Sequence, residues 1–247
     1  MGPKAPFFLL SKALLSISHL FLTMEGRDIA KLIDHTLLRP DATESDIEKL
    51  CQEAVEYGFA SVCTASCWTS FVRQYLDSRK SPVKVCSVVG FPFGSARSDA
   101  KREETWDAVE DGADEIDMVI NVGYLRSGLM ELFEKDIRTV VKVCGTATVK
   151  VIIETCYLTD EEKVVAAQAV KKAGATYVKT STGYGPAGAK LEDVRLIREA
   201  VPDLLIKASG GIRTYDQVKA FTAAGASRIG TSSGPAIMTG ARSESSY

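Results

Sequence analysis

Histidine is nearly absent from this 247-residue chain, which contains only His19 and His35. Because a zinc site for hydrolytic or aldol chemistry normally draws two or three histidines into one pocket, we expect no metal site of that kind. A basic excess is also missing: 30 Lys and Arg stand against 32 Asp and Glu, which disfavours binding of nucleic acid through its phosphates. No apolar run is long enough for an integral membrane protein. The chemistry must come mainly from lysine, carboxylate, serine or cysteine side chains.

Cysteine is present but forms no dense framework. The six cysteines are Cys51, Cys63, Cys67, Cys86, Cys144 and Cys156. Their wide spacing favours free thiols in a reducing cytoplasm over a secreted, disulfide-linked protein. With 45% hydrophobic and 25% charged residues, the composition is that of a soluble globular chain with room for one large domain or two small ones.

The first 23 residues differ from the rest. Residues 7–22 read FFLLSKALLSISHLFL, an apolar stretch broken by polar side chains, and Met24 then opens a segment that resembles a natural chain start. No A-x-A-like cleavage site follows the stretch, and it is short for a spanning helix. Three interpretations of residues 1–23 remain open: a poorly ordered extension, an amphipathic helix packed on the domain or a partner subunit, or a targeting segment.

From residue 29 onward, short apolar runs alternate with helical patterns. The expected strands are residues 32–36, 60–63, 83–89, 115–120, 149–154, 177–180, 204–207 and 228–230. Helices are expected over residues 43–57, 97–111 and 159–172, the first and last of which open with capping sequences. Gly58, Gly112, Gly174 and Gly225 stand where helices should end before the next strand. The repeated unit is helix end, glycine, then strand.

Such alternation predicts parallel strands joined by crossover helices. Eight strands in one domain of this length predict a single (β/α)8 TIM barrel, which we place over residues 24–239, with residues 240–247 as a polar tail. The main competing architecture is an open doubly wound sheet. An open sheet of this kind typically has a Gly-x-Gly-x-x-Gly turn after an early strand, and the chain has none.

The active site of such a barrel lies at the carboxyl ends of its strands. Lys150, Lys179 and Lys207 fall within predicted core strands, where an unpaired ammonium is costly. Each lysine could simply extend its amine to the barrel mouth and form an ion pair. Three lysines together with Asp117 instead favour a reactive amine, because a neighbouring ammonium and desolvation can lower a lysine pKa from its usual 10.4 or so. A neutral lysine forms a Schiff base, and this route requires neither metal nor cofactor.

The last two strands are each followed by a loop of small residues. These loops are residues 209–211, Ser-Gly-Gly, and residues 230–234, Gly-Thr-Ser-Ser-Gly. Barrels commonly hold a phosphate at these loops through backbone N–H groups. Tight turns alone would explain one such loop, but two of them at the expected strands predict a phosphate site.

Seven segments resemble the deoxyribose-phosphate aldolase family, in the expected order across residues 27–239. They are IDHTLLRP (33–40), VGFPFG (89–94), GADEIDMVINVG (112–123), VKVIIET (149–155), YVKTSTGYG (177–185), IKASGGIR (206–213) and RIGTSSG (228–234). The resemblance implies a metal-free lyase that reversibly cleaves 2-deoxy-D-ribose 5-phosphate to D-glyceraldehyde 3-phosphate and acetaldehyde, as part of deoxyribose phosphate catabolism. It also implies a homo-oligomer, because relatives are commonly dimers or tetramers.

The resemblance assigns the catalytic roles. Lys179 of the KTSTG motif would form the Schiff base, Lys207 would lower its pKa, and Asp117 would relay protons. The residues alone do not distinguish Lys179 from Lys207 as the nucleophile. Substrate-binding residues implied with less force are Asp34, Cys63, Lys150, Thr180, Gly183, Tyr184, Gly210, Gly211, Gly230, Ser232 and Ser233.

One departure from the family, the role of the C-terminal tail and two other functions stay open. Tyr184 stands where some members carry a phosphate-binding lysine, so one positive charge is missing. Tyr247 ends a polar tail that either assists proton transfer or is an idle terminus. The alternative functions are a Schiff-base aldolase for another phosphorylated sugar and a non-catalytic phosphate-binding barrel. The second would be expected to have lost Lys179, Lys207 or Asp117, and all three are present.

Overall fold

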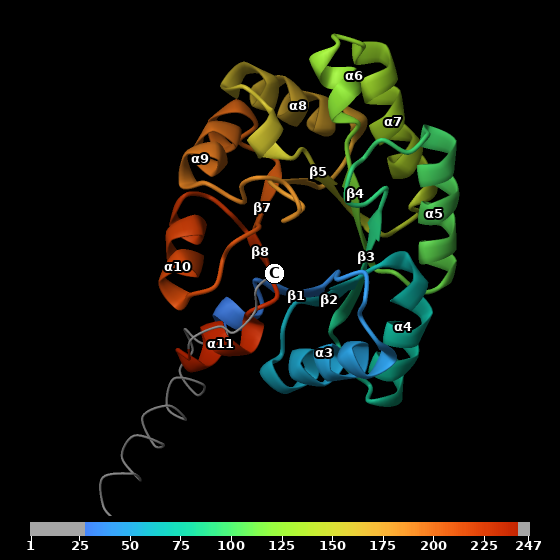
Figure 1. Ribbon diagram of the computed structural model, residues 1–247, viewed down its shortest axis with the longest axis vertical. Coiled ribbons are helices and arrows are strands. Elements are labelled where there is room, and N and C mark those ends of the chain that lie inside the picture. Colours follow the sequence, from blue (N-terminus) through green and yellow to red (C-terminus); the bar gives the residue numbers. More distant parts are fainter. Residues whose placement is uncertain (1–27, 242–247) are drawn as a thin grey trace, which may run out of the picture.

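The computed structural model describes residues 28–241, in which eight parallel strands close into a barrel surrounded by helices (Figure 1). Neighbouring strands pair in chain order, and β8 pairs with β1 to complete the cylinder. The strands are β1 Ile33–Leu37, β2 Ser61–Thr64, β3 Lys84–Val89, β4 Glu115–Val119, β5 Thr148–Ile152, β6 Tyr177–Lys179, β7 Leu205–Ser209 and β8 Arg228–Thr231. The predicted single (β/α)8 barrel is therefore confirmed, and the open sheet is excluded.

The helices that follow the strands form the outer ring. They are α3 Glu44–Tyr57, α4 Thr69–Ser78, α5 Ser98–Glu110, α6 Val122–Arg126, α7 Met130–Val143, α8 Asp160–Ala173, α9 Leu191–Ala200, α10 Tyr215–Ala223 and α11 Gly234–Thr239. Short 3-10 helices cover Ser66–Trp68 and Thr155–Tyr157. Within residues 28–241 no helix has the length and apolarity that crossing a membrane requires. The segment 1–23 and most of the tail 240–247 lie outside the described residues.

The element boundaries differ from the sequence prediction by one or two residues. Thr43 and Thr159, predicted as first helical residues, are N-caps whose side chains accept hydrogen bonds from backbone N–H groups in the first turns of α3 and α8. The strand predicted over residues 149–154 ends at Ile152, because Glu154 adopts a left-handed backbone with φ of 52°. β7 extends two residues further than predicted, to Ser209. That extension brings the Ser-Gly-Gly loop to the barrel mouth.

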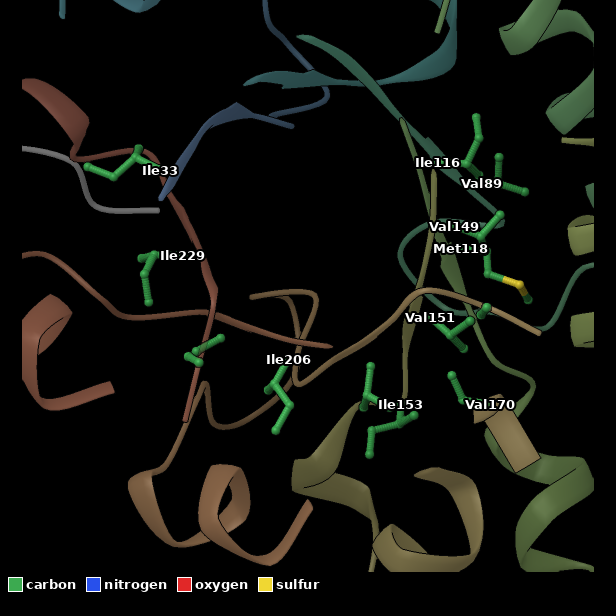
Figure 2. Close-up of a cluster of buried hydrophobic side chains, with 14 of the residues drawn as sticks. Ile33, Val89, Ile116, Met118, Val149, Val151, Ile153, Val170, Ile206 and Ile229 are labelled. Carbon is green, nitrogen blue, oxygen red and sulfur yellow. The ribbon is translucent and has the colours of Figure 1, made fainter. Parts of the chain in front are cut away.

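The apolar core lies between the barrel wall and the helices (Figure 2). Side chains alternate along each strand, so every second residue points outward. These outward positions carry buried aliphatic residues such as Ile116 and Met118 on β4, Val149 and Val151 on β5 and Ile206 on β7. The inward positions of the same strands are largely charged or polar. Burial of the outward-facing aliphatic side chains thus stabilises the barrel. The inward-facing polar residues are therefore not needed for the apolar core.

Candidate active site

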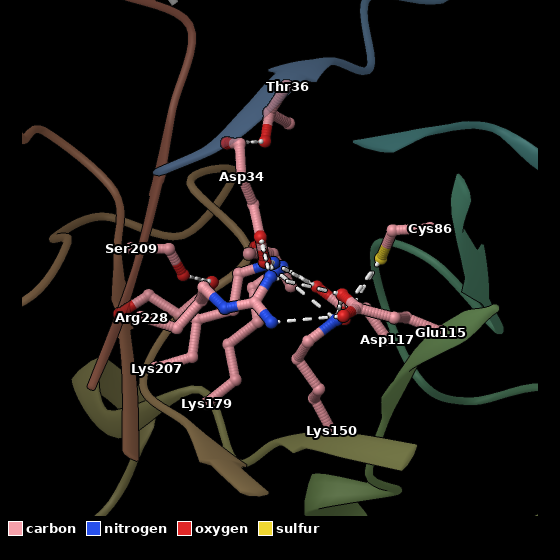
Figure 3. A network of polar contacts seen from close by, with 12 residues as sticks. Asp34, Thr36, Cys86, Glu115, Asp117, Lys150, Lys179, Lys207, Ser209 and Arg228 are labelled. Carbon is pink, nitrogen blue, oxygen red and sulfur yellow. Dashed lines mark hydrogen bonds and ion pairs between the residues drawn. The ribbon is translucent and has the colours of Figure 1, made fainter. Parts of the chain in front are cut away.

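Charged side chains from six of the eight strands meet inside the barrel (Figure 3). β4 contributes Glu115 and Asp117. The others are Asp34 on β1, Lys150 on β5, Lys179 on β6, Lys207 on β7 and Arg228 on β8. All of these residues except Arg228 are at most 5% exposed. Branched aliphatic side chains usually fill this space in such barrels, so the polar interior is the feature that requires a functional explanation.

Asp117 connects the three lysines. Its Oδ2 lies 2.8 Å from Lys179 Nζ and 2.6 Å from Lys207 Nζ, while its Oδ1 lies 2.8 Å from Lys150 Nζ. Cys86 also donates to Oδ1, at 3.2 Å. Because Lys179 and Lys207 share one carboxylate oxygen, their nitrogens are close neighbours. The convergence of lysines expected from the strand ends is present.

A second set of contacts closes the cluster on the side away from the pocket. Lys207 Nζ lies 2.5 Å from Asp34 Oδ2, and Asp34 Oδ1 lies 2.5 Å from Arg228 Nη1. The other guanidinium nitrogen of Arg228 lies 3.0 Å from Glu115 Oε1, and Glu115 Oε2 lies 2.6 Å from Lys150 Nζ. Positive and negative groups therefore alternate around a closed ring.

These contacts fix the charges of the inner residues. Burial alone would raise the pKa of Asp117, but the surrounding lysines hold it well below its ordinary value. The pKa of Asp34 is likewise lowered, by Lys207, Lys150 and Arg228 against the effect of burial. Burial alone would lower the pKa of Lys207, yet Asp117 and Asp34 raise it above its ordinary value. Lys207 is thus an ammonium group beside Lys179.

The three lysines differ in their access to ligand. Lys179 lines a pocket at the barrel mouth, whereas Lys150 and Lys207 are absent from its walls and are fully buried. The pocket is also lined by Thr36, which lies in β1, and by Leu38, which follows that strand. An aldehyde entering this pocket would meet the amine of Lys179 first.

Residues of both predicted small-residue loops line the same pocket as Lys179. Five residues predicted to bind substrate line the pocket: Gly183, Gly210, Gly211, Gly230 and Ser232. Gly230 also leaves room inside the barrel, because a Cβ atom there would lie 3.0 Å from Cε of Lys207. The predicted small-residue loops therefore lie beside Lys179 in a shared pocket.

Other residues predicted to bind substrate lie outside the pocket wall. Cys63, like Asp34 and Lys150, is fully buried inside the barrel. The Thr180 hydroxyl donates to the backbone oxygen of Ser209, which ties β6 to β7. The hydroxyl of Tyr184 donates to the Leu38 backbone oxygen at 2.7 Å. Both of these hydrogen bonds are within the protein, and none of the five residues lines the pocket that contains Lys179.

Two further predicted residues call for separate mention. Ser233 lines a different hollow, beside α3 and α11, although the adjacent Ser232 borders both. Tyr247 lies outside the described residues, so its predicted role in proton transfer stays a prediction.

Sequence reasoning missed three charged residues. Arg228 and Glu115 are the first residues of β8 and β4, and both face the barrel interior. Because side chains alternate along a strand, Glu115 faces the same side as Asp117, and this pattern could have identified it from the sequence. Arg213 lines the pocket beside the Gly210–Gly211 turn and supplies a positive charge there. It follows the strand by several residues, and no local pattern points its side chain at the pocket.

Cys63, Cys86 and Asp117 place three potential metal ligands within 4.8 Å of one another. However, both carboxylate oxygens of Asp117 contact ammonium groups, and Lys150 Nζ lies 3.4 Å from Cys86 Sγ. A cation at this point would lie beside those positive charges. This environment disfavours metal binding.

Comparison with known proteins identifies the relatives of this chain. The family model for DeoC/LacD family aldolases matches residues 29–240. The chain is 84% identical to deoxyribose-phosphate aldolase of Methanocella arvoryzae over 224 residues, covering 91% of this chain and 100% of that protein. It is 55% identical to the Thermococcus gammatolerans enzyme of the same name over 222 residues, covering 89% of this chain and 99% of that protein.

A solved structure agrees with these matches. The tetrameric deoxyribose phosphate aldolase from Aeropyrum pernix has a TM-score of 0.81 to this chain at 34% sequence identity. The likeness covers 90% of this chain and 95% of the other. The lysine-lined barrel and both sequence comparisons lead to one conclusion: the chain belongs to the DeoC/LacD family of aldolases and is a carbon–carbon lyase.

Proposed function

We propose that the chain cleaves 2-deoxy-D-ribose 5-phosphate reversibly to D-glyceraldehyde 3-phosphate and acetaldehyde, through a Schiff base on Lys179. The observation that carries this assignment is that Lys179 lines the pocket, whereas Lys207 and Lys150 are fully buried and do not line it. Relatives at 84% and 55% identity bear the corresponding name. The proposal thus rests both on the position of Lys179 in the pocket and on sequence similarity to these relatives.

The groups around Lys179 carry equal numbers of negative and positive charges. Asp34, Glu115 and Asp117 carry three negative charges, and the positive charges of Lys150, Lys207 and Arg228 equal them. A neutral amine is the form that attacks an aldehyde.

The reaction follows from this arrangement. The Lys179 amine adds to the substrate aldehyde, and loss of water gives an iminium ion. Removal of the proton from the C3 hydroxyl breaks the C2–C3 bond, releases glyceraldehyde 3-phosphate and leaves an enamine. Protonation of the enamine at C2 and addition of water release acetaldehyde and restore the amine. Asp117 touches both Lys179 and Lys207 and can carry protons between them and the substrate.

The phosphate end would bind the loops that follow β7 and β8. Gly210 and Gly211 allow the backbone to approach an anion closely, and Ser232 offers a hydroxyl donor. Arg213 supplies positive charge there.

We expect Arg213→Ala to raise KM for the phosphorylated substrate about fivefold with little change in kcat. The reason is that an exposed charge contact contributes about 1 kcal/mol at most. Steady-state kinetics would measure the change. Non-phosphorylated 2-deoxyribose provides the control, because its kcat/KM should be equal in both proteins. An equal loss with both sugars would show that Arg213 does not recognise phosphate.

Reductive trapping tests the proposed function directly. Borohydride added with 2-deoxyribose 5-phosphate should fix a two-carbon or five-carbon adduct on Lys179, located by mass spectrometry of peptides. Acetaldehyde alone should label the same lysine. Labelling at Lys207, or trapping by a different phosphorylated sugar but not by this one, would overturn the assignment and favour an aldolase of other specificity.

We also propose that the chain forms a dimer or tetramer and acts in the cytoplasm. The solved relative from Aeropyrum pernix is described as tetrameric, and all six cysteines are free thiols, as the reducing cytoplasm favours. Sedimentation velocity would test the first point, where a monomer at micromolar concentration would contradict it. Cell fractionation would test the second, where recovery outside the cytoplasmic fraction would contradict it.

A further inference from the structure

We infer that Arg228 and Glu115 are positioning residues that set the charge of the lysine cluster from the end of the barrel opposite the pocket. This inference rests on the proposed Schiff base at Lys179 and extends it to two residues that do not touch the substrate. Neither residue lines the pocket. Both begin their strands, β8 and β4, whereas Lys179 ends β6.

Two chains of ion pairs connect these residues to the reactive amine (Figure 3). Arg228 contacts Asp34, Asp34 contacts Lys207, and Lys207 shares Asp117 Oδ2 with Lys179. Glu115 contacts Lys150, which contacts the other oxygen of the same carboxylate. Arg228 and Glu115 also bind each other, so the two chains close into one ring.

Burial makes this ring sensitive to single charges. Asp34, Asp117, Lys150 and Lys207 are all fully buried, so water screens their interactions poorly. The Arg228 side chain is 15% exposed and that of Glu115 is 6% exposed. Removal of one charge from the ring should therefore change the electrostatic potential at the Lys179 amine.

Every strand of the barrel faces this cluster with a titratable or charged group. The groups are Asp34 on β1, Cys63 on β2, Cys86 on β3, Glu115 and Asp117 on β4, Lys150 on β5, Tyr177 and Lys179 on β6, Lys207 on β7 and Arg228 on β8. Burial raises the pKa of the Cys86 thiol well above its ordinary value, and Asp117 adds to the rise. Apart from Glu115 and Arg228 themselves, these groups are common to the parent and the variants, so the comparison isolates the charge that each substitution removes.

The expected effects have opposite signs. Glu115→Gln leaves one surplus positive charge, which disfavours protonation of Lys179, so the acid limb of kcat/KM against pH should move about one unit lower. Arg228→Gln leaves a surplus negative charge, so the acid limb should move about one unit higher. The double variant restores the balance, and its acid limb should return close to that of the parent.

Three controls separate charge from damage to the fold. Arg228→Lys keeps the positive charge, so its acid limb should stay at the parent position even if kcat falls. Asp193→Asn disrupts a buried pair with Lys163 between α8 and α9, outside the barrel, and should lower the melting temperature without moving the limb. Thermal unfolding of each variant shows that folded protein is being compared.

The outcomes decide the inference. Opposite shifts that cancel in the double variant support it. Shifts of the same sign, or no shift in the near-isosteric Glu115→Gln variant, overturn it and leave Arg228 and Glu115 a purely structural role. Borohydride trapping of the parent enzyme is run alongside. Absence of an adduct on Lys179 in the parent would mean that the proposed function fails, whereas trapping without opposite shifts would reject this inference alone.

Discussion

Lys179→Leu should abolish aldolase activity, with kcat reduced at least about 10⁴-fold, and should eliminate the borohydride-trapped adduct. The substitution removes the nitrogen that opens on the pocket, and loss of a covalent nucleophile is among the largest effects a single substitution produces. Cleavage of 2-deoxyribose 5-phosphate, coupled to detection of acetaldehyde, would measure the rate. Mass spectrometry after reduction would measure the adduct.

Lys179→Arg provides the matched control for this experiment. It keeps a long side chain that ends in nitrogen beside Asp117, but a guanidinium group does not form the Schiff base. Both variants should be folded and inactive. Appreciable turnover by either one, or an adduct that moves to Lys207 or Lys150, would mean that Lys179 is not the nucleophile.

Lys207→Leu should lower kcat at neutral pH by about 10² to 10⁴-fold while the barrel remains folded. Lys207 pairs with Asp34 and Asp117 and is fully buried, so its loss leaves the cluster with one surplus negative charge. That surplus favours the protonated, unreactive form of Lys179 and removes a partner in proton transfer. Steady-state kinetics across pH would measure the effect, and part of the lost activity should return as pH rises.

Lys163→Leu tests whether loss of any buried lysine would suffice. Lys163 is 8% exposed and pairs with Asp193 and Asp160, away from the pocket. This variant should lose stability, because it leaves Asp193 buried without its ammonium partner, yet retain normal kcat. Near-normal turnover of Lys207→Leu at neutral pH would contradict the proposed electrostatic role of that residue.

Much of the architecture could be predicted because its signals are local. Helix caps such as Thr43 and glycine stops such as Gly174 depend on a few neighbouring residues. Alternation along β4 would also have indicated that Glu115 shares the face of Asp117, and both residues contact Lys150 inside the barrel. Errors arose where a single residue changed the backbone, as at Glu154, whose positive φ ends the extended run early.

The site could be predicted only in part. Strand-end position and residue type drew attention to Lys150, Lys179, Lys207 and Asp117, and the structure brings all four together. The family resemblance implied that Tyr184 and Thr180 bind substrate, and in the structure their hydroxyls donate to backbone oxygens. Whether a polar side chain meets a ligand or its own fold depends on neighbours that are distant in sequence.

The sequence by itself determined the succession of strands and helices, the outward apolar faces and the presence of several lysines at strand ends. The tertiary structure decided which lysine opens on the pocket and which charges complete the ring. Arg228 and Glu115 are 113 positions apart in the chain and meet only because β8 closes on β1. Closure of the barrel joins residues that are far apart in the sequence. Local sequence patterns therefore do not predict that these two charged residues meet inside it.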